Sequence, residues 1–514
     1  MSKKFNNHKR LQSAQRAMER GRADLAMAKL QDITRRTPNH SGAWKLLGFA
    51  CHEEQLEPEA VVALTRAAAL DPGDAATAMA LAQSSLLAGL PALEPFRRVL
   101  QLQPDDLNAQ RGYALALATE QQSDAAETVL MSRLKQHPDW LAGHKLLARL
   151  RFTGGDSEHF ADSFSAACEA QPANLALRME WFRSVAQTRD WSAAGRIIDQ
   201  GERIFGTHPQ LQLARLFIAS ESGDELKAAQ LFAATASIDD VMRDMALVRY
   251  SLRKGDLDIA EATARPRIAT PAENVFWPYL ALIWRLQGIP QAAQWLDGSP
   301  PHVAAVDLQF ADGELNRLAD LLRKLHTARS PFAEQSVRGG TQTDQNLFLR
   351  HEPILRALKS RIQAAVRTYV EQLPSPIPGH PLLGVERGDL RRGRIHFSGS
   401  WSVRLQAQGF NVSHTHPLGW ISSAFYVALP PATSMGAAPA GWLQFGTPPA
   451  ELKLALSPTA QQEPKAGRLV LFPSTMWHST VPFNDGERLV VAFDVRAPQS
   501  ALAPSITAAS NRAV

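Results

Sequence analysis

The stretch that decides the fold of the N-terminal half is "SGAWKLLGFACHEEQLEPEAVVALTRAAALDP", residues 41–72. It contains two segments of helical periodicity, and small residues recur where two antiparallel helices would have to approach closely. The positions that define the unit are Trp44, Leu47, Gly48, Ala60, Leu64, Ala67 and Pro72. Proline lacks a backbone donor, so Pro72 ends the second helix. The stretch therefore predicts a pair of packed helices.

The proline of this unit recurs along the chain in similar settings. It stands in "RTPNH", "LDPGD", "LQPDD", "KQHPDW", "AQPAN" and "GTHPQ", as Pro38, Pro72, Pro104, Pro138, Pro172 and Pro209. The gaps between these prolines are 34, 32, 34, 34 and 37 residues. The alternative is a generic helical bundle with prolines in its loops, but five nearly equal gaps favour stacked helix pairs.

Residues 41–72 resemble the tetratricopeptide repeat (TPR) almost position for position, and residues 141–172 resemble it more loosely. The resemblance implies an α-solenoid. Beyond Pro209 the helical texture continues while the period blurs, so we expect degenerate repeats after about residue 210 and up to about residue 300.

The character of the chain changes at "GSPPHV", residues 298–303, and we expect a second domain over residues 302–497. There "AAVDLQF" predicts a strand and "ELNRLADLLRKLH" an amphipathic helix. From about residue 393 short aromatic and β-branched runs alternate with turn residues, which predicts a double-stranded β-helix, or jelly roll. Residues 498–514 are small, polar and aperiodic, and we expect them to be disordered. The fold class is multidomain α + β, a TPR-like α-solenoid over residues 1–300 and then a jelly roll with flanking helices.

The composition is that of an ordinary globular protein of 514 residues with a formal net charge of +5. So small a surplus gives nucleic acid no particular support as a partner. Cys51 and Cys168 are too few for a disulfide framework and fit a reducing compartment as buried apolar side chains. The first 30 residues lack an apolar leader and the chain lacks a run long enough to cross a membrane, so we expect a cytoplasmic location without membrane attachment.

A candidate metal site lies in "NVSHTHPLGW", residues 411–420. If "FNVSHTH" is extended, His414 and His416 point to the same side, because side chains two apart on a strand share a face. A third candidate, His478, follows the predicted strand "GRLVLFP", and Arg488 comes ten residues later.

This order resembles that of the Fe(II)/2-oxoglutarate oxygenases. Together with "SVRGGTQTDQNLF" and "SSAFYV", it is similar over nearly all of residues 302–497 to the oxygenase domains that follow TPRs in bacteria. The resemblance assigns His414, His416 and His478 to iron as the catalytic metal ligands, with open positions for 2-oxoglutarate and dioxygen. It assigns Arg488 to the far carboxylate of 2-oxoglutarate, with Tyr426 as a second contact.

One departure from the wider superfamily concerns His416, since most members carry Asp or Glu there. Three neutral imidazoles leave the site one positive charge richer than the usual triad. In an alternative arrangement His416 stands off and water fills its place, and in a third the domain binds no functional metal. Packing roles are the simpler interpretation of His396 and Trp401, and Arg488 could instead pair with Asp494 on the same strand face.

The resemblance implies a hydroxylase that couples oxidative decarboxylation of 2-oxoglutarate to hydroxylation of a target. The concave face of the repeats is expected to select a protein or peptide, with dioxygen as co-substrate. Two alternatives stay open, a cupin-type metalloprotein with different chemistry and a non-catalytic TPR scaffold. The cupin alternative lacks the glutamate expected shortly after the second histidine, because Trp420 and its neighbours fill that span.

Overall fold

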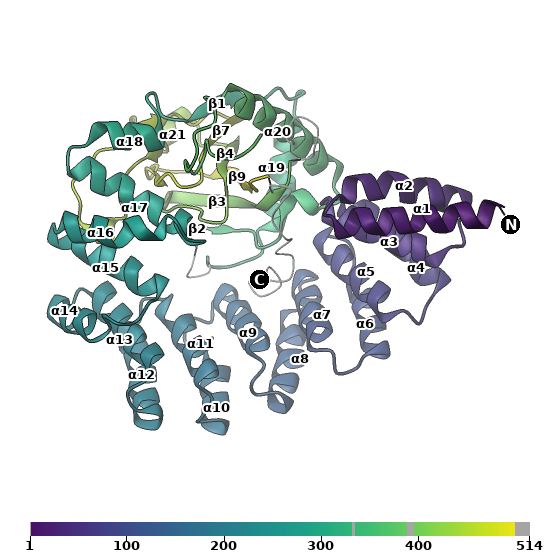
Figure 1. Ribbon diagram of the computed structural model, residues 1–514, viewed down its shortest axis with the longest axis horizontal. Coiled ribbons are helices and arrows are strands. Elements are labelled where there is room, and N and C mark those ends of the chain that lie inside the picture. The colour runs from purple at the N-terminus through teal and green to yellow at the C-terminus, as the bar shows by residue number, and fades with distance from the viewer. Residues whose placement is uncertain (1, 332–334, 388–394, 499–514) are drawn as a thin grey trace.

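The computed structural model describes residues 2–331, 335–387 and 395–498, with helices in the N-terminal part and strands in the C-terminal part (Figure 1). The helices of the first part are α1 (Ser2–Glu19), α2 (Ala23–Arg36), α3 (Ser41–Glu53), α4 (Glu57–Leu70), α5 (Ala75–Leu87), α6 (Leu93–Leu102), α7 (Leu107–Thr119), α8 (Ser123–Gln136), α9 (Leu141–Gly154), α10 (Asp162–Ala170), α11 (Leu175–Ala186), α12 (Trp191–Phe205), α13 (Pro209–Ser222), α14 (Glu225–Ala234), α15 (Val241–Lys254), α16 (Leu257–Arg267), α17 (Glu273–Leu286) and α18 (Pro290–Asp297). Neighbouring helices pack on one another, and the pairs form one curved array.

The turns between helix pairs show why the prolines recur. Pro72 follows the end of α4, and Asp74 then caps α5 by accepting a hydrogen bond from the backbone N–H of Ala76 at 3.1 Å. Pro104 and Asp106 repeat this order between α6 and α7. Proline ends one helix because it lacks a donor, and the aspartate two residues later satisfies the free N–H groups of the next.

Small residues bring the paired helices together. A Cβ atom at Gly48 of α3 would overlap the side chain of Leu64 on α4, and one at Gly112 of α7 would overlap the ring of Phe96 on α6. These contacts are the close approach that the sequence predicted, and the α-solenoid is confirmed. The pairing continues after residue 210, where α13, α15 and α17 each begin a further pair.

The C-terminal part consists of two antiparallel sheets with a few helices. Its strands are β1 (Ala304–Asp307), β2 (Val337–Gln342), β3 (Phe397–Asn411), β4 (Ile421–Ala428), β5 (Leu443–Phe445), β6 (Ala460–Gln462), β7 (Arg468–Pro473), β8 (His478–Thr480) and β9 (Arg488–Val495). Its helices are α19 (Glu314–Leu325), α20 (Pro353–Gln372), the short α21 (Ala432–Met435) and the 3-10 turns η1 (Leu347–Leu349) and η2 (Ala450–Leu452). The sheet orders are β1-β7-β4-β9-β3-β2 and β6-β5-β8. The predicted fold class is confirmed, although the two sheets do not close into a barrel.

Strand β9 shows how alternation separates the two faces of the larger sheet. Leu489 and Val491 join the apolar core that α19 and α20 cover. Arg488, Val490 and Ala492 point to the opposite face, where they line a cavity. One strand therefore supplies both the core of the domain and a wall of its candidate site.

The solenoid curves around the sheets, so that its concave side faces them (Figure 1). Near its N-terminal end the Gln55 amide donates to the backbone oxygen of Phe397 at 2.7 Å. Near its C-terminal end the indole N–H of Trp477 donates to the backbone oxygen of Pro278, in α17, at 2.9 Å. The two parts are thus joined by specific contacts at both ends of the arc.

The predicted boundary near residue 302 stays a prediction, which limited proteolysis tests at residues 298–303. The predicted disordered tail lies outside the described residues, except for residue 498. Among the helices that the structure describes, none is long and apolar enough to cross a membrane.

Candidate metal centre

The three histidines singled out in the sequence lie together in the structure. His414 and His416 follow β3, and His478 opens β8. One ring nitrogen from each lies within 4.8 Å of those of the other two. The ring centroids are 4.2 Å apart for His414 and His478, 4.9 Å for His414 and His416, and 5.1 Å for His416 and His478. This spacing suits three ligands of one metal ion.

The backbone holds this cluster differently from the sequence-based interpretation. Strand β3 ends at Asn411, so the two histidines after it do not share the face of a regular strand. Instead His414 and His478 form an isolated antiparallel bridge, with two reciprocal N–H···O bonds of 3.1 Å. The backbone N–H of His416 donates to Ser474 O at 3.0 Å. The convergence therefore depends on pairing with the segment around residue 478, which lies 64 residues after His414.

Each imidazole is oriented by a hydrogen bond at Nδ1. That of His414 lies 2.8 Å from Val412 O, that of His478 3.1 Å from Met476 O, and that of His416 2.9 Å from Asp494 Oδ2. Carbonyl and carboxylate oxygens only accept, so Nδ1 carries the hydrogen in all three rings. The Nε2 atom of each ring is thereby left as the position for a metal, as is usual for histidine ligands.

Burial favours the neutral form of two of these rings. Loss of solvent lowers the pKa of His414 to about 3, with a further contribution from the neighbouring His416. Burial also lowers the pKa of His478 well below its ordinary value, and the other two imidazoles add to the effect. Neutral rings at physiological pH have the free electron pair that a metal needs.

Arg488 forms a second polar feature of the same cavity. It is only 2 % exposed, and its Nη2 donates to the Tyr426 hydroxyl at 3.4 Å. Its Nε and Nη1 are buried without a hydrogen-bond partner among the described residues. Burial raises the pKa of Tyr426, which stays a neutral phenol and cannot balance the guanidinium. A buried guanidinium with unsatisfied donors calls for an anionic partner, and a carboxylate ligand supplies one.

Asp494 is a site residue that the sequence analysis did not assign. It is 7 % exposed and accepts from the His416 ring and, at 2.6 Å, from the Ser422 hydroxyl. The alternative pairing of Arg488 with Asp494 is not what the structure has, because the carboxylate is turned to His416 instead. The available signal was strand alternation, which places Asp494 on the same face as Arg488.

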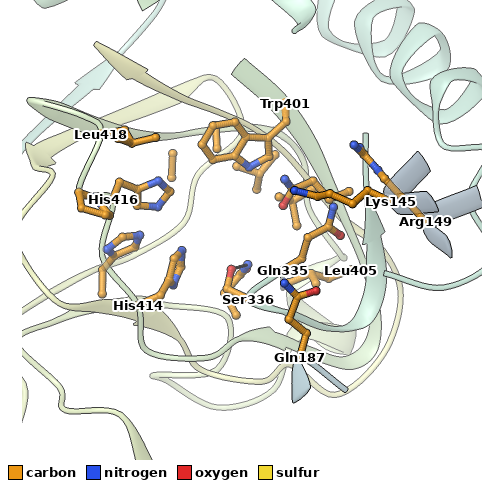
Figure 2. Close-up of a pocket in the computed structure, with 18 of the residues that line it drawn as sticks. Lys145, Arg149, Gln187, Gln335, Ser336, Trp401, Leu405, His414, His416 and Leu418 are labelled. Atoms are coloured by element: carbon orange, nitrogen blue, oxygen red, sulfur yellow. Dashed lines mark hydrogen bonds between the residues drawn. The ribbon is translucent and has the colours of Figure 1, made fainter. Parts of the chain in front are cut away.

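Both parts of the chain line the cavity, whose volume is about 1250 Å³. Its lining includes all three histidines and Arg488 from the sheets, and Arg111, Lys145, Arg149 and Gln187 from the solenoid. Figure 2 shows His414 and His416 on one wall, with Lys145 and Arg149 across from them.

Trp401 and His396, for which packing roles were expected, lie in different parts of the structure. Trp401 lines the cavity and stacks on His416, with ring centroids 5.6 Å apart and planes 12° from parallel. His396 lies elsewhere, 3.7 Å from the Glu54 carboxylate of the solenoid. Trp401 thus packs against the face of the His416 ring, whereas His396 belongs to the junction of the two parts.

Comparison with protein-family models matches residues 399–494 to the family described as "Putative 2OG-Fe(II) oxygenase". Residues 399–494, within the C-terminal part of the chain, are thus similar to a domain of this family. The match contains the three histidines, Arg488 and Asp494. A search of curated proteins finds no match to this chain.

The chain also has partial similarity to solved structures. MamA (residues 41 to the end) from Desulfovibrio magneticus is 18 % identical, with 33 % of this chain and 97 % of that one covered and a TM-score of 0.30. A TPR protein from Parabacteroides merdae is 15 % identical, with 50 % and 98 % covered and a TM-score of 0.31. A prolyl-4-hydroxylase from Pseudomonas putida is 17 % identical, with 38 % and 94 % covered and a TM-score of 0.27. Similarities of this size carry no argument about the function of this chain.

Proposed function

We propose that this protein is an Fe(II)- and 2-oxoglutarate-dependent hydroxylase of a protein or peptide target. His414, His416 and His478 hold the iron in this proposal. Arg488 binds the far carboxylate of 2-oxoglutarate, with Tyr426 as its neighbour. The observation that carries the proposal is the presence, in one cavity, of three imidazoles oriented through Nδ1 and a buried arginine with two unsatisfied donors.

Iron and 2-oxoglutarate, when bound, would supply oxidative decarboxylation of the oxoacid to succinate, coupled to hydroxylation of the target by dioxygen. The protein's contribution is to position these groups and to keep water away. Val490 and Ala492 flank Arg488 on the same strand face, and Phe472 packs 4.6 Å from the His478 ring. Such an apolar setting strengthens the attraction between the guanidinium and a carboxylate.

An anaerobic titration with Fe(II) and 2-oxoglutarate tests the cofactor assignment. We expect stoichiometric iron, and a visible charge-transfer band when the oxoacid is added. Aerobic release of succinate then separates the hydroxylase from the cupin-type and scaffold alternatives. Stoichiometric iron without either the band or succinate would contradict the proposal.

Selection of the target by the solenoid is the finer part of the proposal. It is supported by the cavity, which the concave side of α9 and α11 shares with the histidine cluster. Lys145 of α9 lines this cavity with a side chain that is about half exposed, and its Nζ lies 3.4 Å from Glu180 of α11. A target that enters the site therefore passes charged and amide side chains of the solenoid.

A pool of cellular peptides that stimulates succinate release can test this selection. Lys145→Glu is expected to reduce the stimulation by peptides several-fold while iron and 2-oxoglutarate binding are kept. Lys135→Glu is the matched control, because Lys135 is an exposed residue of α8 that does not line the cavity. Equal stimulation in both variants would remove this wall from target selection.

A further inference from the structure

The proposed ligand set lacks the carboxylate that usually completes an iron site of this kind. The common facial triad has two histidines and one carboxylate, and the carboxylate contributes one negative charge. Here the third position is His416, which is neutral when it binds through Nε2. The ligands alone leave the ion with its full charge of +2, in a cavity that also contains Arg488.

A carboxylate is nevertheless present directly behind the third histidine, in hydrogen-bond contact with its ring. Asp494 Oδ2 lies 2.9 Å from Nδ1 of His416, on the side of the ring opposite to its proposed metal-binding atom. Among the described residues, His416 is its partner in the ion pairs of the structure, so no lysine or arginine there neutralises it. Its side chain is about one-tenth exposed, so solvent does little to screen its charge.

The surroundings of Asp494 fix this carboxylate in place. The Ser422 hydroxyl donates to its Oδ1 at 2.6 Å and lies 2.8 Å from the Ser474 hydroxyl. Gly419 follows two residues after Pro417, and a Cβ atom there would crowd both Ser474 and Asp494. The loop that carries His416 therefore packs tightly over the carboxylate, and Trp401 stacks on the ring.

We infer that Asp494 is a positioning residue that supplies, through the His416 imidazole, the negative charge which a carboxylate ligand supplies in the usual triad. The inference rests on the proposed function. A ring that donates from Nδ1 to a carboxylate becomes a stronger donor at Nε2, because part of its positive charge is balanced. The histidine–aspartate pair replaces the missing ligand charge while keeping three nitrogen ligands.

Asp494→Asn separates the charge from the position. The amide oxygen of the new side chain can still accept from Nδ1 of His416. Its NH₂ group can donate to the Ser422 hydroxyl, which can turn to donate to Ser474. The ring orientation is then kept and one negative charge is lost.

The anaerobic titration with Fe(II) and 2-oxoglutarate measures the consequence. We expect the iron affinity of Asp494→Asn to fall about 10- to 100-fold. The charge-transfer band is expected to move to shorter wavelength, because a less electron-rich iron gives up its electron less easily. Asp307→Asn is the matched control, since it removes a carboxylate of β1 that is paired with Lys465 and Arg468 and does not line the cavity. It should change neither quantity.

A second variant distinguishes the proposed charge effect from a folding defect, because it should shift the band in the opposite direction. Ser422→Ala keeps the carboxylate but removes a donor from it, so its negative charge acts more strongly on His416. The band should then move slightly to longer wavelength, opposite to the shift in Asp494→Asn.

Two outcomes contradict different statements. A parent protein that binds neither iron nor 2-oxoglutarate would overturn the proposed function and this inference with it. A parent that binds both, with the same band and iron affinity in Asp494→Asn, or a Ser422→Ala band that does not move to longer wavelength, would overturn only the role of Asp494.

Discussion

Arg488 offers the sharpest test of the cofactor, because its substitution should separate binding of 2-oxoglutarate from binding of iron. The side chain is 2 % exposed and two of its nitrogens lack partners among the described residues. In Arg488→Ala the carboxylate of the oxoacid would enter a buried site without its cation. Breaking a buried ion pair on one side costs about 3–5 kcal/mol, and 1.4 kcal/mol corresponds to about tenfold in affinity. We therefore expect 2-oxoglutarate to bind at least roughly 100-fold more weakly.

Arg488→Lys refines this expectation. Lysine keeps the positive charge but cannot form the two-pronged contact, so the affinity for 2-oxoglutarate should fall by only about tenfold. Iron binding should survive in both variants, because Arg488 is not among the three residues of the metal cluster.

Thermal or denaturant unfolding of the iron-loaded protein under anaerobic conditions supplies an independent assay. At 2-oxoglutarate a hundred times its Kd, binding stabilises the parent by about 2.7 kcal/mol. A variant with 100-fold weaker binding gains only about 0.4 kcal/mol at the same concentration.

Arg488→Met adds a control for folding. It removes an unsatisfied buried cation, so the protein without ligands should be at least as stable as the parent. Equal affinity for 2-oxoglutarate in Arg488→Ala and in the parent, both loaded with iron, would refute the reasoning.

Three further predictions concern the third ligand, the helix packing and the acid sensitivity. His416→Ala should lower iron affinity by about tenfold or more, because removal of a residue that only hydrogen-bonds to a metal ligand already lowers metal affinity about tenfold. Unchanged iron content would favour the two-histidine arrangement. Gly48→Ala should lower the free energy of unfolding by about 1–3 kcal/mol, because the methyl group overlaps Leu64. Gly195→Ala on α12, where the new methyl group meets open space, should raise it by about 0.5–1 kcal/mol, and urea unfolding compares the two. Burial lowers the pKa of His326 to about 4, and its ring nitrogens lie 2.8 Å from Thr341 Oγ1 and 3.0 Å from Ser402 Oγ. As the pH falls from 6.5 towards 4, His326 becomes protonated in the unfolded chain but stays neutral in the folded protein, which favours unfolding. His326 should thus contribute up to about 2 kcal/mol to the loss of stability by pH 5, and His326→Gln should reduce the loss by about that amount, as urea unfolding at pH 7.5 and 5 would measure.

The solenoid could be predicted from the sequence because its signals are local. In the turns at Pro72 and Pro104 a proline follows the second helix and Asp74 or Asp106 caps the next one, so such a turn is decided within a few residues. The face of β9 that carries Arg488 could be predicted for the same reason, since alternation along a strand needs no distant partner.

The arrangement of the candidate site depends on distant contacts and could be predicted only in part. Strand alternation did not bring His414 and His416 together, because β3 ends before them and the bridge to His478 sets their position. Nor does the sequence show that Asp494 pairs with His416 and not with Arg488, since His416 and Asp494 lie 78 positions apart. Such pairings depend on tertiary packing, which the hydrophobic periodicity of the sequence does not predict.

The same packing joins the solenoid to the candidate metal centre at α17. The indole N–H of Trp477, the residue before His478, donates to the backbone oxygen of Pro278 at 2.9 Å. The amide of Asn274 donates to the backbone oxygen of Pro417, the residue after His416, at 3.1 Å. Proline at position 278 lies within the helix, where it leaves the carbonyl of an earlier residue without its usual helical partner. One helix of the solenoid therefore contacts both segments that bear the histidines, and these hydrogen bonds help to fix the two segments relative to each other.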